Sequence, residues 1–125
     1  MRNKTEEIVQ FLKDWKVAAS SQIIDFVPRP KNIEGIKELG LTIRQARLIL
    51  QSLVLENYVS GPVSDTDRQH DKIWVFGLNI ESREVYIKIK LFMYQKILKA
   101  KCLSFHPAEY PLRYPFKGGD YFEHN

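Results

Sequence analysis

Three segments in the second half of the chain alternate between apolar and other side chains with a period of two residues. They span residues 73–80, 85–91 and 101–106. Successive side chains of a β-strand point to opposite faces of a sheet, so the pattern predicts strands that are buried on one face. In the middle segment the apolar face comprises Val85, Ile87, Ile89 and Leu91, and the polar face comprises Tyr86, Lys88 and Lys90. The three segments are therefore expected to form an antiparallel meander.

The first two segments are joined by a short turn, which we expect at Ser82-Arg83. This turn sets Glu81 opposite Glu84. Gly77 then lies across from Lys88 on the polar face. The missing side chain of Gly77 either lets the backbone of a ligand come close or marks a bulge or bend in the strand.

The second and third segments are expected to form a hairpin centred near Lys96. This register pairs Tyr86 with His106 and Lys88 with Ser104. In the third segment Leu103 and Phe105 face the core, and the opposite face comprises Cys102, Ser104 and His106. A phenol, an imidazole and ammonium groups therefore meet on one face of the sheet.

The first half of the chain has helical spacing. Asn3 or Thr5 is expected to cap a helix that runs to about Val17. Apolar residues three and four positions apart give this helix one buried face, made of Ile8, Phe11, Leu12 and Trp15. Residues 21–27 are a short apolar run before Pro28, which predicts either an edge strand or an extension of the helix.

A second and a third helix are expected before the meander. Asn32 is expected to cap a short helix that ends before Gly40, where glycine favours the left-handed conformation of a helix end. Thr42 and Gln45 have the spacing of a capping box, which predicts another helix running to about Leu55.

The remaining segments are polar or rich in proline. Residues 57–71 lack periodicity and predict a loop, residues 108–117 predict an extended strap on the surface, and residues 118–125 predict a flexible tail. The sequence thus predicts one α+β domain over residues 1–117. Its N-terminal helices pack on one face of an antiparallel sheet of three or four strands, and its other face is partly open.

Composition limits the classes of protein to consider. The chain has 125 residues, of which 44% are hydrophobic and 27% charged, as expected of a folded globular domain. It contains no apolar run long enough for a membrane helix and no signal peptide, so we expect a cytoplasmic protein that does not contact a membrane. The single cysteine excludes an internal disulfide, and with three histidines the sequence predicts no metal site. The net charge of +4 permits an anionic partner.

The convergence of Tyr86, His106 and Lys88 fits cleavage of RNA without a metal ion. This reaction needs a base for the 2′-hydroxyl, an acid for the leaving 5′-oxygen, and cations beside the charged phosphorane. Histidine titrates near neutral pH and is the expected acid or base, Tyr86 is expected to position the phosphate, and Lys88 and Lys90 are expected to stabilise charge. Each residue taken alone is equally compatible with a structural role: a tyrosine of good β-propensity, lysines on a solvated face, and a histidine at a strand end.

Further cations are candidates for binding the RNA backbone. Lys90 and Lys101 lie on the expected strands, Arg68 and His70 on the polar loop, and Arg113 and Lys117 on the strap, where a purely solvated position is the alternative.

The motifs also resemble a known family. Trp74 is followed eleven residues later by Val85-Tyr86-Ile87-Lys88-Ile89 and then by Leu103-Ser104-Phe105. This order resembles the C-terminal half of the MqsR toxins, the motility quorum-sensing regulator family of bacterial toxin–antitoxin systems. Leu39-Gly40-Leu41, the segment Glu56-Asn57-Tyr58 with Ser60, and the acidic loop that contains His70 are similar to the family as well, so the resemblance covers residues 39–105.

The resemblance implies a RelE-like α+β fold and an endoribonuclease that cleaves mRNA without a cofactor. It also implies a cognate helix-turn-helix antitoxin that binds DNA, with a homodimer or a toxin–antitoxin hetero-oligomer as the assembly. Tyr86 matches the strand tyrosine of the family's site. Three positions differ, because His106 replaces a lysine, Val75 a glutamine and Val59 a lysine.

Two other functions are compatible with the sequence. The first is a non-catalytic module of the same fold that binds RNA or a protein. Val59 and Val75 favour this function, because they stand at positions where the family has polar residues. The second is a helix-turn-helix protein whose recognition helix, residues 42–53, reads DNA through Arg44, Gln45, Arg47 and Gln51.

Overall fold

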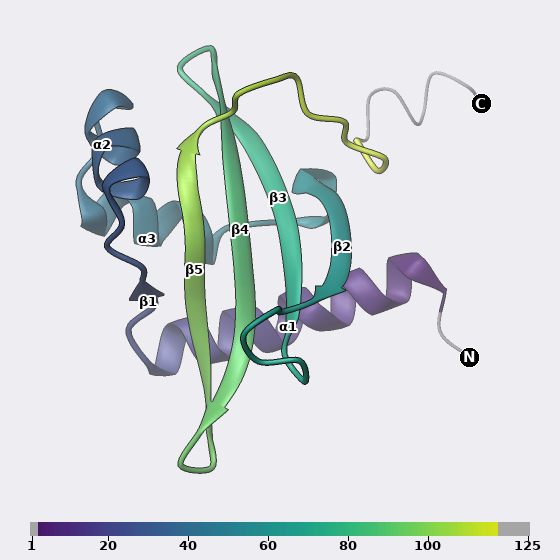
Figure 1. The fold of residues 1–125 in the computed structure, drawn as a ribbon. Coiled ribbons are helices and arrows are strands. Elements are labelled where there is room, and N and C mark those ends of the chain that lie inside the picture. Colours follow the sequence, from purple (N-terminus) through teal and green to yellow (C-terminus); the bar gives the residue numbers. More distant parts are fainter. Residues whose placement is uncertain (1–2, 118–125) are drawn as a thin grey trace.

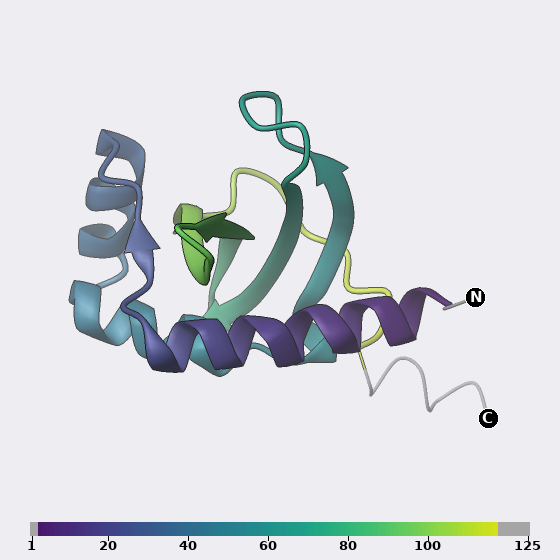
Figure 2. The ribbon, with the colours of Figure 1, turned by 90° about the horizontal axis from the view of Figure 1, so that it is seen from below.

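Three helices and a five-stranded sheet form the domain. The computed structural model describes residues 3–117. In chain order the elements are α1 (Lys4–Ser21), β1 (Asp25–Phe26), α2 (Pro30–Glu38), α3 (Ile43–Gln51), a 3-10 turn η1 (Leu55–Asn57), β2 (Tyr58–Ser64), β3 (Lys72–Ile80), β4 (Arg83–Tyr94) and β5 (Ile97–Pro107). The sheet has the order β1-β5-β4-β3-β2. α1 crosses one face of the sheet, and α2 and α3 lie beside the β1–β5 edge (Figures 1 and 2).

The expected α+β class is confirmed, but the expected sheet of three or four antiparallel strands is wrong. The sheet has five strands and is mixed, because β1 pairs in parallel with β5 while the other neighbours are antiparallel. In the run at residues 21–27, Asp25–Phe26 form the expected edge strand, while Ser21 is the last residue of a longer α1, so each of the two alternatives holds in part. The face opposite α1 is called the open face below.

α1 packs on the sheet through the face that the spacing predicts. Asn3 caps the helix and forms a capping box with Glu6. The helix is four residues longer than expected and ends at Ser21. Phe11 stacks on Trp74 of β3 with 4.6 Å between ring centroids, and the indole nitrogen of Trp15 donates a hydrogen bond to the carbonyl of Leu50, 2.8 Å away. α1, α3 and the sheet therefore share one core.

The junction between α2 and α3 is confirmed. Gly40 has a φ of 73°, and the side chains of Thr42 and Gln45 bond each other's backbone amides as a capping box. α3 is shorter than expected and ends at Gln51, because the chain turns at Ser52 before the 3-10 turn.

The expected cap at Asn32 is wrong. α2 begins at Pro30, whose fixed φ suits the first helical position, so Asn32 lies inside the first turn. Its fully buried side chain donates to the carbonyl of Leu103 at 3.0 Å and accepts from the amide of Phe105 at 3.1 Å. β1 pairs with β5 only at Lys101 and Cys102. Further along the same edge of β5, the side chain of Asn32 provides the hydrogen bonds that a neighbouring strand would otherwise make.

The expected loop over residues 57–71 is a strand in its first half. β2 occupies Tyr58–Ser64 and pairs with β3 with two irregularities of register. Its Gly61-Pro62 sequence is typical of a loop, but glycine and proline are tolerated in an edge strand with irregular pairing. Residues 65–71 form the connection between β2 and β3.

The expected register of β3 and β4 is wrong by two residues. The turn lies at Glu81-Ser82, which have φ values of 47° and 70°, and not at Ser82-Arg83. Gly77 therefore pairs with Tyr86, and Val75 pairs with Lys88. A shift of two residues keeps every side chain on its expected face.

The expected register of β4 and β5 is confirmed at its functional end. Tyr86 pairs with His106 and Lys88 with Ser104. A bulge at Leu103 follows, after which Cys102 pairs with Ile89 on the core side. Cys102 is thus fully buried and not on the polar face where it was expected. The extra residue of a bulge reverses the alternation on the strand that carries it.

The chain leaves β5 as the expected strap, residues 108–117, which crosses one end of the open face toward β2 (Figures 1 and 2). Leu112 and Tyr114 bond the carboxylate of Glu84 at 2.9 and 2.8 Å. A Cβ on Gly77 would lie 2.6 Å from Leu112 and 2.9 Å from Tyr114. The missing side chain of Gly77 therefore makes room for the strap. Neither expected explanation, the approach of a ligand backbone or a bulge, applies. Residues 118–125, expected as a flexible tail, lie outside the described residues.

Candidate functional site

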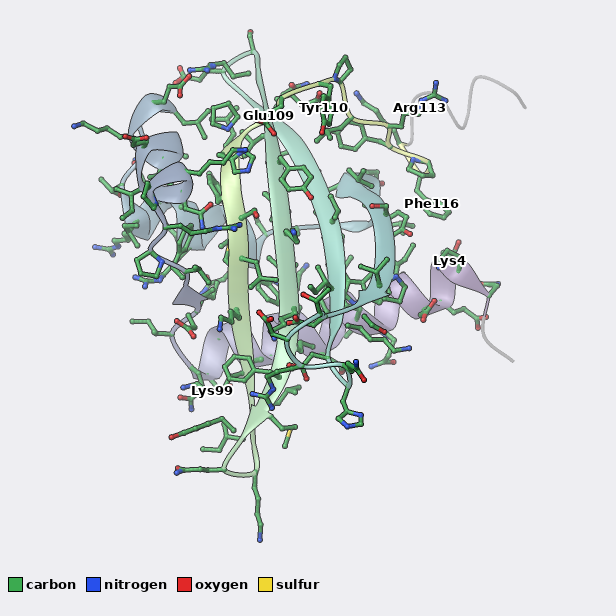
Figure 3. All side chains as sticks on the ribbon, in the orientation of Figure 1. Lys4, Lys99, Glu109, Tyr110, Arg113 and Phe116 are labelled. Atoms are coloured by element: carbon green, nitrogen blue, oxygen red, sulfur yellow. The ribbon has the colours of Figure 1, made fainter. Side chains whose placement is uncertain are left out.

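A cavity of about 330 Å³ opens on the open face between the ends of β4 and β5, the start of α2 and the strap. It is lined by Arg29, Lys31, Tyr86, Lys88, Ser104, His106, Glu109, Tyr110 and Leu112. Glu109 and Tyr110 lie where the strap begins, at the end of β5 (Figure 3). The structure thus brings together the three residues Tyr86, His106 and Lys88 that the sequence predicted as a site.

His106 is a mostly buried residue of this cavity. Its ring stacks on Tyr86 with 5.4 Å between centroids and an angle of 24° between planes. Gly35 of α2 comes so close to the backbone of His106 that a Cβ there would lie 2.6 Å from the Cβ of His106. Only 6% of His106 is exposed. The stacking on Tyr86 and the close approach of α2 therefore fix the place of His106 between the sheet and the helix.

The hydrogen bond of His106 decides which ring nitrogen carries the proton. Nδ1 lies 2.9 Å from the carbonyl oxygen of Pro107. A carbonyl oxygen only accepts, so Nδ1 is the donor and carries a hydrogen. In the neutral ring Nε2 then has a free lone pair. Nε2 is therefore the atom of His106 that is able to take a proton from a molecule in the cavity.

Three cations line the same cavity as His106. Arg29 donates from Nη2 to the hydroxyl of Ser104 and to the carbonyl of Leu103, both at 2.8 Å. Lys31 forms an ion pair with Glu109 at 3.0 Å, and Lys88 lies on β4 opposite Ser104 of β5. The ammonium group of Lys31 lowers the pKa of Glu109, and His106 adds to this effect. The cavity therefore holds three positive side chains and one carboxylate.

Tyr86 keeps its hydroxyl proton. Burial raises the pKa of its phenol, and the nearby Tyr110 raises it further, against the smaller opposing effects of Arg29 and Lys31. A phenol with a raised pKa is a hydrogen-bond donor at neutral pH, which suits contact with a phosphate oxygen.

Lys90 does not belong to this cavity, so its expected role in charge stabilisation and RNA binding is disfavoured. The alternation correctly puts it on the open face, but the β2–β3 connection folds over that face. The ammonium group of Lys90 donates to Asp65 at 2.5 Å and to Asp71 at 2.9 Å, and only 4% of the residue is exposed. Burial lowers the pKa of Lys90, but the hydrogen bonds to both carboxylates outweigh burial and raise it. The hydrogen bond from Lys90 likewise lowers the pKa of Asp65.

The other predicted RNA-binding residues are spread over three places. Arg68 and Lys101 lie beside the ring of Phe92, at 5.9 and 5.7 Å from its centroid. His70 lines a groove between α1 and the far ends of β3, β4 and β5. Arg113 and Lys117 line a hollow of about 660 Å³ between the strap and Glu84 of β4. None of them lines the cavity of His106.

Sequence reasoning missed part of the cavity lining. Arg29 and Lys31 lie at the N-terminal end of α2, more than 70 positions from Ser104 and His106. Glu109, Tyr110 and Leu112 come from the strap. The cluster of positive charge at the start of a helix is a signal in the sequence, but nothing local shows that it reaches β5.

The helix-turn-helix interpretation is disfavoured by the same contacts that build the domain. Arg47 bonds the carbonyl of Ile24, and Gln51 bonds the carbonyl of Ala19. Gln45 is used in the capping box. Three of the four side chains expected to read DNA are thus engaged within the chain.

Comparison with protein-family models, with curated proteins and with solved structures finds no match. The resemblance to the MqsR toxins stays a prediction. Across residues 3–117, none of the helices combines the length and apolar character required to cross a membrane. The same part of the chain contains no group of three or more His, Cys, Asp or Glu residues arranged to hold a metal ion.

Proposed function

We propose that this chain is the toxin of a bacterial type II toxin–antitoxin system, with a RelE-like fold, and that it cleaves mRNA in the cytoplasm as an endoribonuclease. The observation that carries the proposal is that His106, whose Nδ1 bonds a backbone carbonyl and whose Nε2 is left free, lines the same cavity as Arg29, Lys31 and Lys88. A base and several cations around one cavity are what phosphodiester cleavage by the 2′-hydroxyl requires.

Each group has a role in this reaction. Nε2 of His106 takes the proton of the 2′-hydroxyl, whose oxygen forms a bond to the adjacent phosphorus. The bond from phosphorus to the 5′-oxygen breaks, and this oxygen takes up a proton from Lys88. Arg29 and Lys31 replace Lys90 as the groups that stabilise the phosphorane, and the hydroxyl of Tyr86 positions the phosphate. The products are a 2′,3′-cyclic phosphate and a 5′-hydroxyl, and no metal ion is needed.

The proposed partners are mRNA as substrate and a cognate helix-turn-helix antitoxin that neutralises the enzyme and binds operator DNA. The assembly is either a homodimer or a toxin–antitoxin hetero-oligomer.

The test is cleavage of RNA by the purified chain, together with growth on expression. The wild type is expected to cleave single-stranded RNA to 2′,3′-cyclic phosphate ends and to arrest growth. His106→Gln, which keeps most of the side-chain volume, and Tyr86→Phe are expected to do neither. His70→Ala is the matched control, because His70 lies outside the cavity.

Cleavage by His106→Gln at the wild-type rate would overturn the proposal, as would equal growth of all variants with no cut RNA. RNA binding without cleavage would instead favour the non-catalytic module. Circular dichroism and unfolding midpoints establish that each variant is folded.

A further inference from the structure

A second group of side chains continues from the cavity along the open face. It comprises Phe92 and Tyr94 of β4 and Lys99 and Lys101 of β5, which we call the β5 tract. We propose that the β5 tract binds single-stranded RNA that extends from the scissile phosphate. This inference rests on the proposed function, because it concerns the remainder of the same substrate.

The tract lies on the same face as the cavity. Lys101 pairs with Lys90 and Lys99 pairs with Phe92, so both lysines point to the open face. The ammonium group of Lys101 lies 5.7 Å from the ring centroid of Phe92, and that of Lys99 lies 5.6 Å from the centroid of Tyr94. Figure 3 shows Lys99 toward the β4–β5 hairpin, far from Glu109 and Tyr110 at the cavity.

The charges of the tract are free to meet a phosphate. Within residues 3–117, neither Lys99 nor Lys101 has a carboxylate within 4.0 Å, whereas the neighbouring Lys90 and Arg68 are both paired with Asp71. Tyr94 is 53% exposed although it is a large aromatic residue. Phe92 is partly buried, so Tyr94 is the exposed ring of the tract. Free ammonium groups beside an exposed aromatic ring are features by which proteins hold single-stranded nucleic acid.

The dimensions fit a short stretch of RNA. The β2–β3 connection covers Lys90 on β4, so the path from the cavity runs along β5 from Ser104 to Lys99. Because of the bulge at Leu103, this stretch runs beside only four steps of β4, from Lys88 to Phe92, and measures about 14 Å. Stacked nucleotides advance about 3.4 Å each along one strand, so the path spans about four nucleotides. The bases must be unpaired, because a duplex hides the base faces that would stack on Tyr94.

The test measures binding by fluorescence anisotropy in the full chain with His106→Ala, so that the RNA stays intact. The probes are an unstructured RNA of about 12 nucleotides and a trinucleotide, which is too short to reach from the cavity to Tyr94. Tyr94→Ala is expected to weaken binding of the longer RNA by about 5- to 150-fold and to leave the trinucleotide unchanged. Tyr94→Phe keeps the ring and is expected to bind as the parent does.

Replacing Lys99 and Lys101 together by alanine is expected to lower the slope of log affinity against log salt by about 1.4. Lys13→Ala with Lys16→Ala, two exposed lysines of α1, is the control for loss of charge alone. Unchanged affinity of the tract variants for the longer RNA would overturn the inference. So would equally tight binding of a blunt RNA duplex, or the absence of RNA binding, which would point to a protein occupant.

The two proposals fail separately. If the wild type does not cut RNA but Tyr94→Ala loses affinity for the longer probe, RNA binding by the β5 tract is supported and the nuclease proposal is refuted. If the wild type cuts RNA and every tract variant binds as the parent does, the nuclease proposal is supported and RNA binding by the tract is refuted.

Discussion

Replacing Lys90 by methionine leaves Asp65 and Asp71 without the ammonium group that bonds both of them. The two hydrogen bonds measure 2.5 and 2.9 Å, and Lys90 and Asp65 are 4% and 6% exposed. Removing one partner of a buried ion pair costs about 3–5 kcal/mol, because the remaining charge is buried without compensation. With a typical urea dependence of about 2 kcal/mol per molar, the unfolding midpoint is expected to fall by about 1.5–2.5 M.

The pH dependence gives this prediction its sharpest test. The folded-state pKa of Asp65 is lowered, so its contribution to stability is present above its unfolded pKa of about 3.9 and is lost as the pH falls through the folded value. The pKa of Lys90 is raised, so its contribution is present below about pH 10.4 and is lost as the pH rises through the folded value. In Lys90→Met the carboxylate of Asp65 loses the hydrogen bond that lowers its pKa and takes up a proton more readily. The loss of unfolding free energy in Lys90→Met relative to the wild type is therefore expected to become smaller as the pH is lowered from 7 to about 4.

Urea unfolding followed by tryptophan fluorescence measures both effects. Lys72→Met, at an exposed position where β3 begins, is the control and is expected to change stability by less than about 0.5 kcal/mol. The triple variant with Lys90→Met, Asp65→Asn and Asp71→Asn is expected to regain much of the loss, because no charge stays buried. A loss below about 1 kcal/mol for Lys90→Met, or one that does not change with pH, would refute the reasoning.

Three further predictions concern the scaffold of the cavity. Gly35→Ala is expected to destabilise the fold by about 1–3 kcal/mol in urea unfolding, because a Cβ would lie 2.8 Å from the Cα of His106. At an exposed helix position the same substitution would instead stabilise the protein by about 1 kcal/mol, so a stabilised variant would contradict the close contact. Asn32→Ala is expected to cost about 1–3 kcal/mol and to speed hydrogen exchange at the amide of Phe105, and unchanged exchange there would show that the bond is unimportant. Burial raises the pKa of the Cys102 thiol, so Ellman's reagent is expected to react with it only after denaturation, and rapid reaction of the native protein would contradict its burial.

Local signals in the sequence were sufficient for the helix starts with side-chain caps and for the faces of the β3 and β4 residues, but not for Cys102 of β5, which lies beyond the bulge at Leu103. Asn3, Gly40 and the Thr42–Gln45 box act at short range, so their structure follows from neighbouring residues. Alternation determines only which face a residue occupies, and a shift of two residues leaves that face unchanged. This is why the register of β3 and β4 was wrong while Gly77 was still assigned to the correct face.

What could not be predicted depends on contacts between distant segments. Lys90 is chemically the same as Lys88, and only the fold of the β2–β3 connection over the sheet makes one a buried ion-pair partner and leaves the other in the cavity. Arg29 and the strap reach the site through tertiary packing. The bulge at Leu103 could not be predicted from the alternation of side chains, because a cysteine at position 102 is compatible with either face of a sheet.

The lining of the cavity by Arg29 from the first quarter of the chain and by Tyr110 from its last has a consequence for synthesis. A ribosome must translate at least as far as Leu112 before the lining is complete, so a nascent chain lacks the cavity even when α1, α2 and α3 have already formed. A chain that stops before β5 has neither His106 nor the strap. Any activity of the cavity therefore requires the strap to have been synthesised, and a partner that binds the first helices during translation meets them before the cavity is assembled.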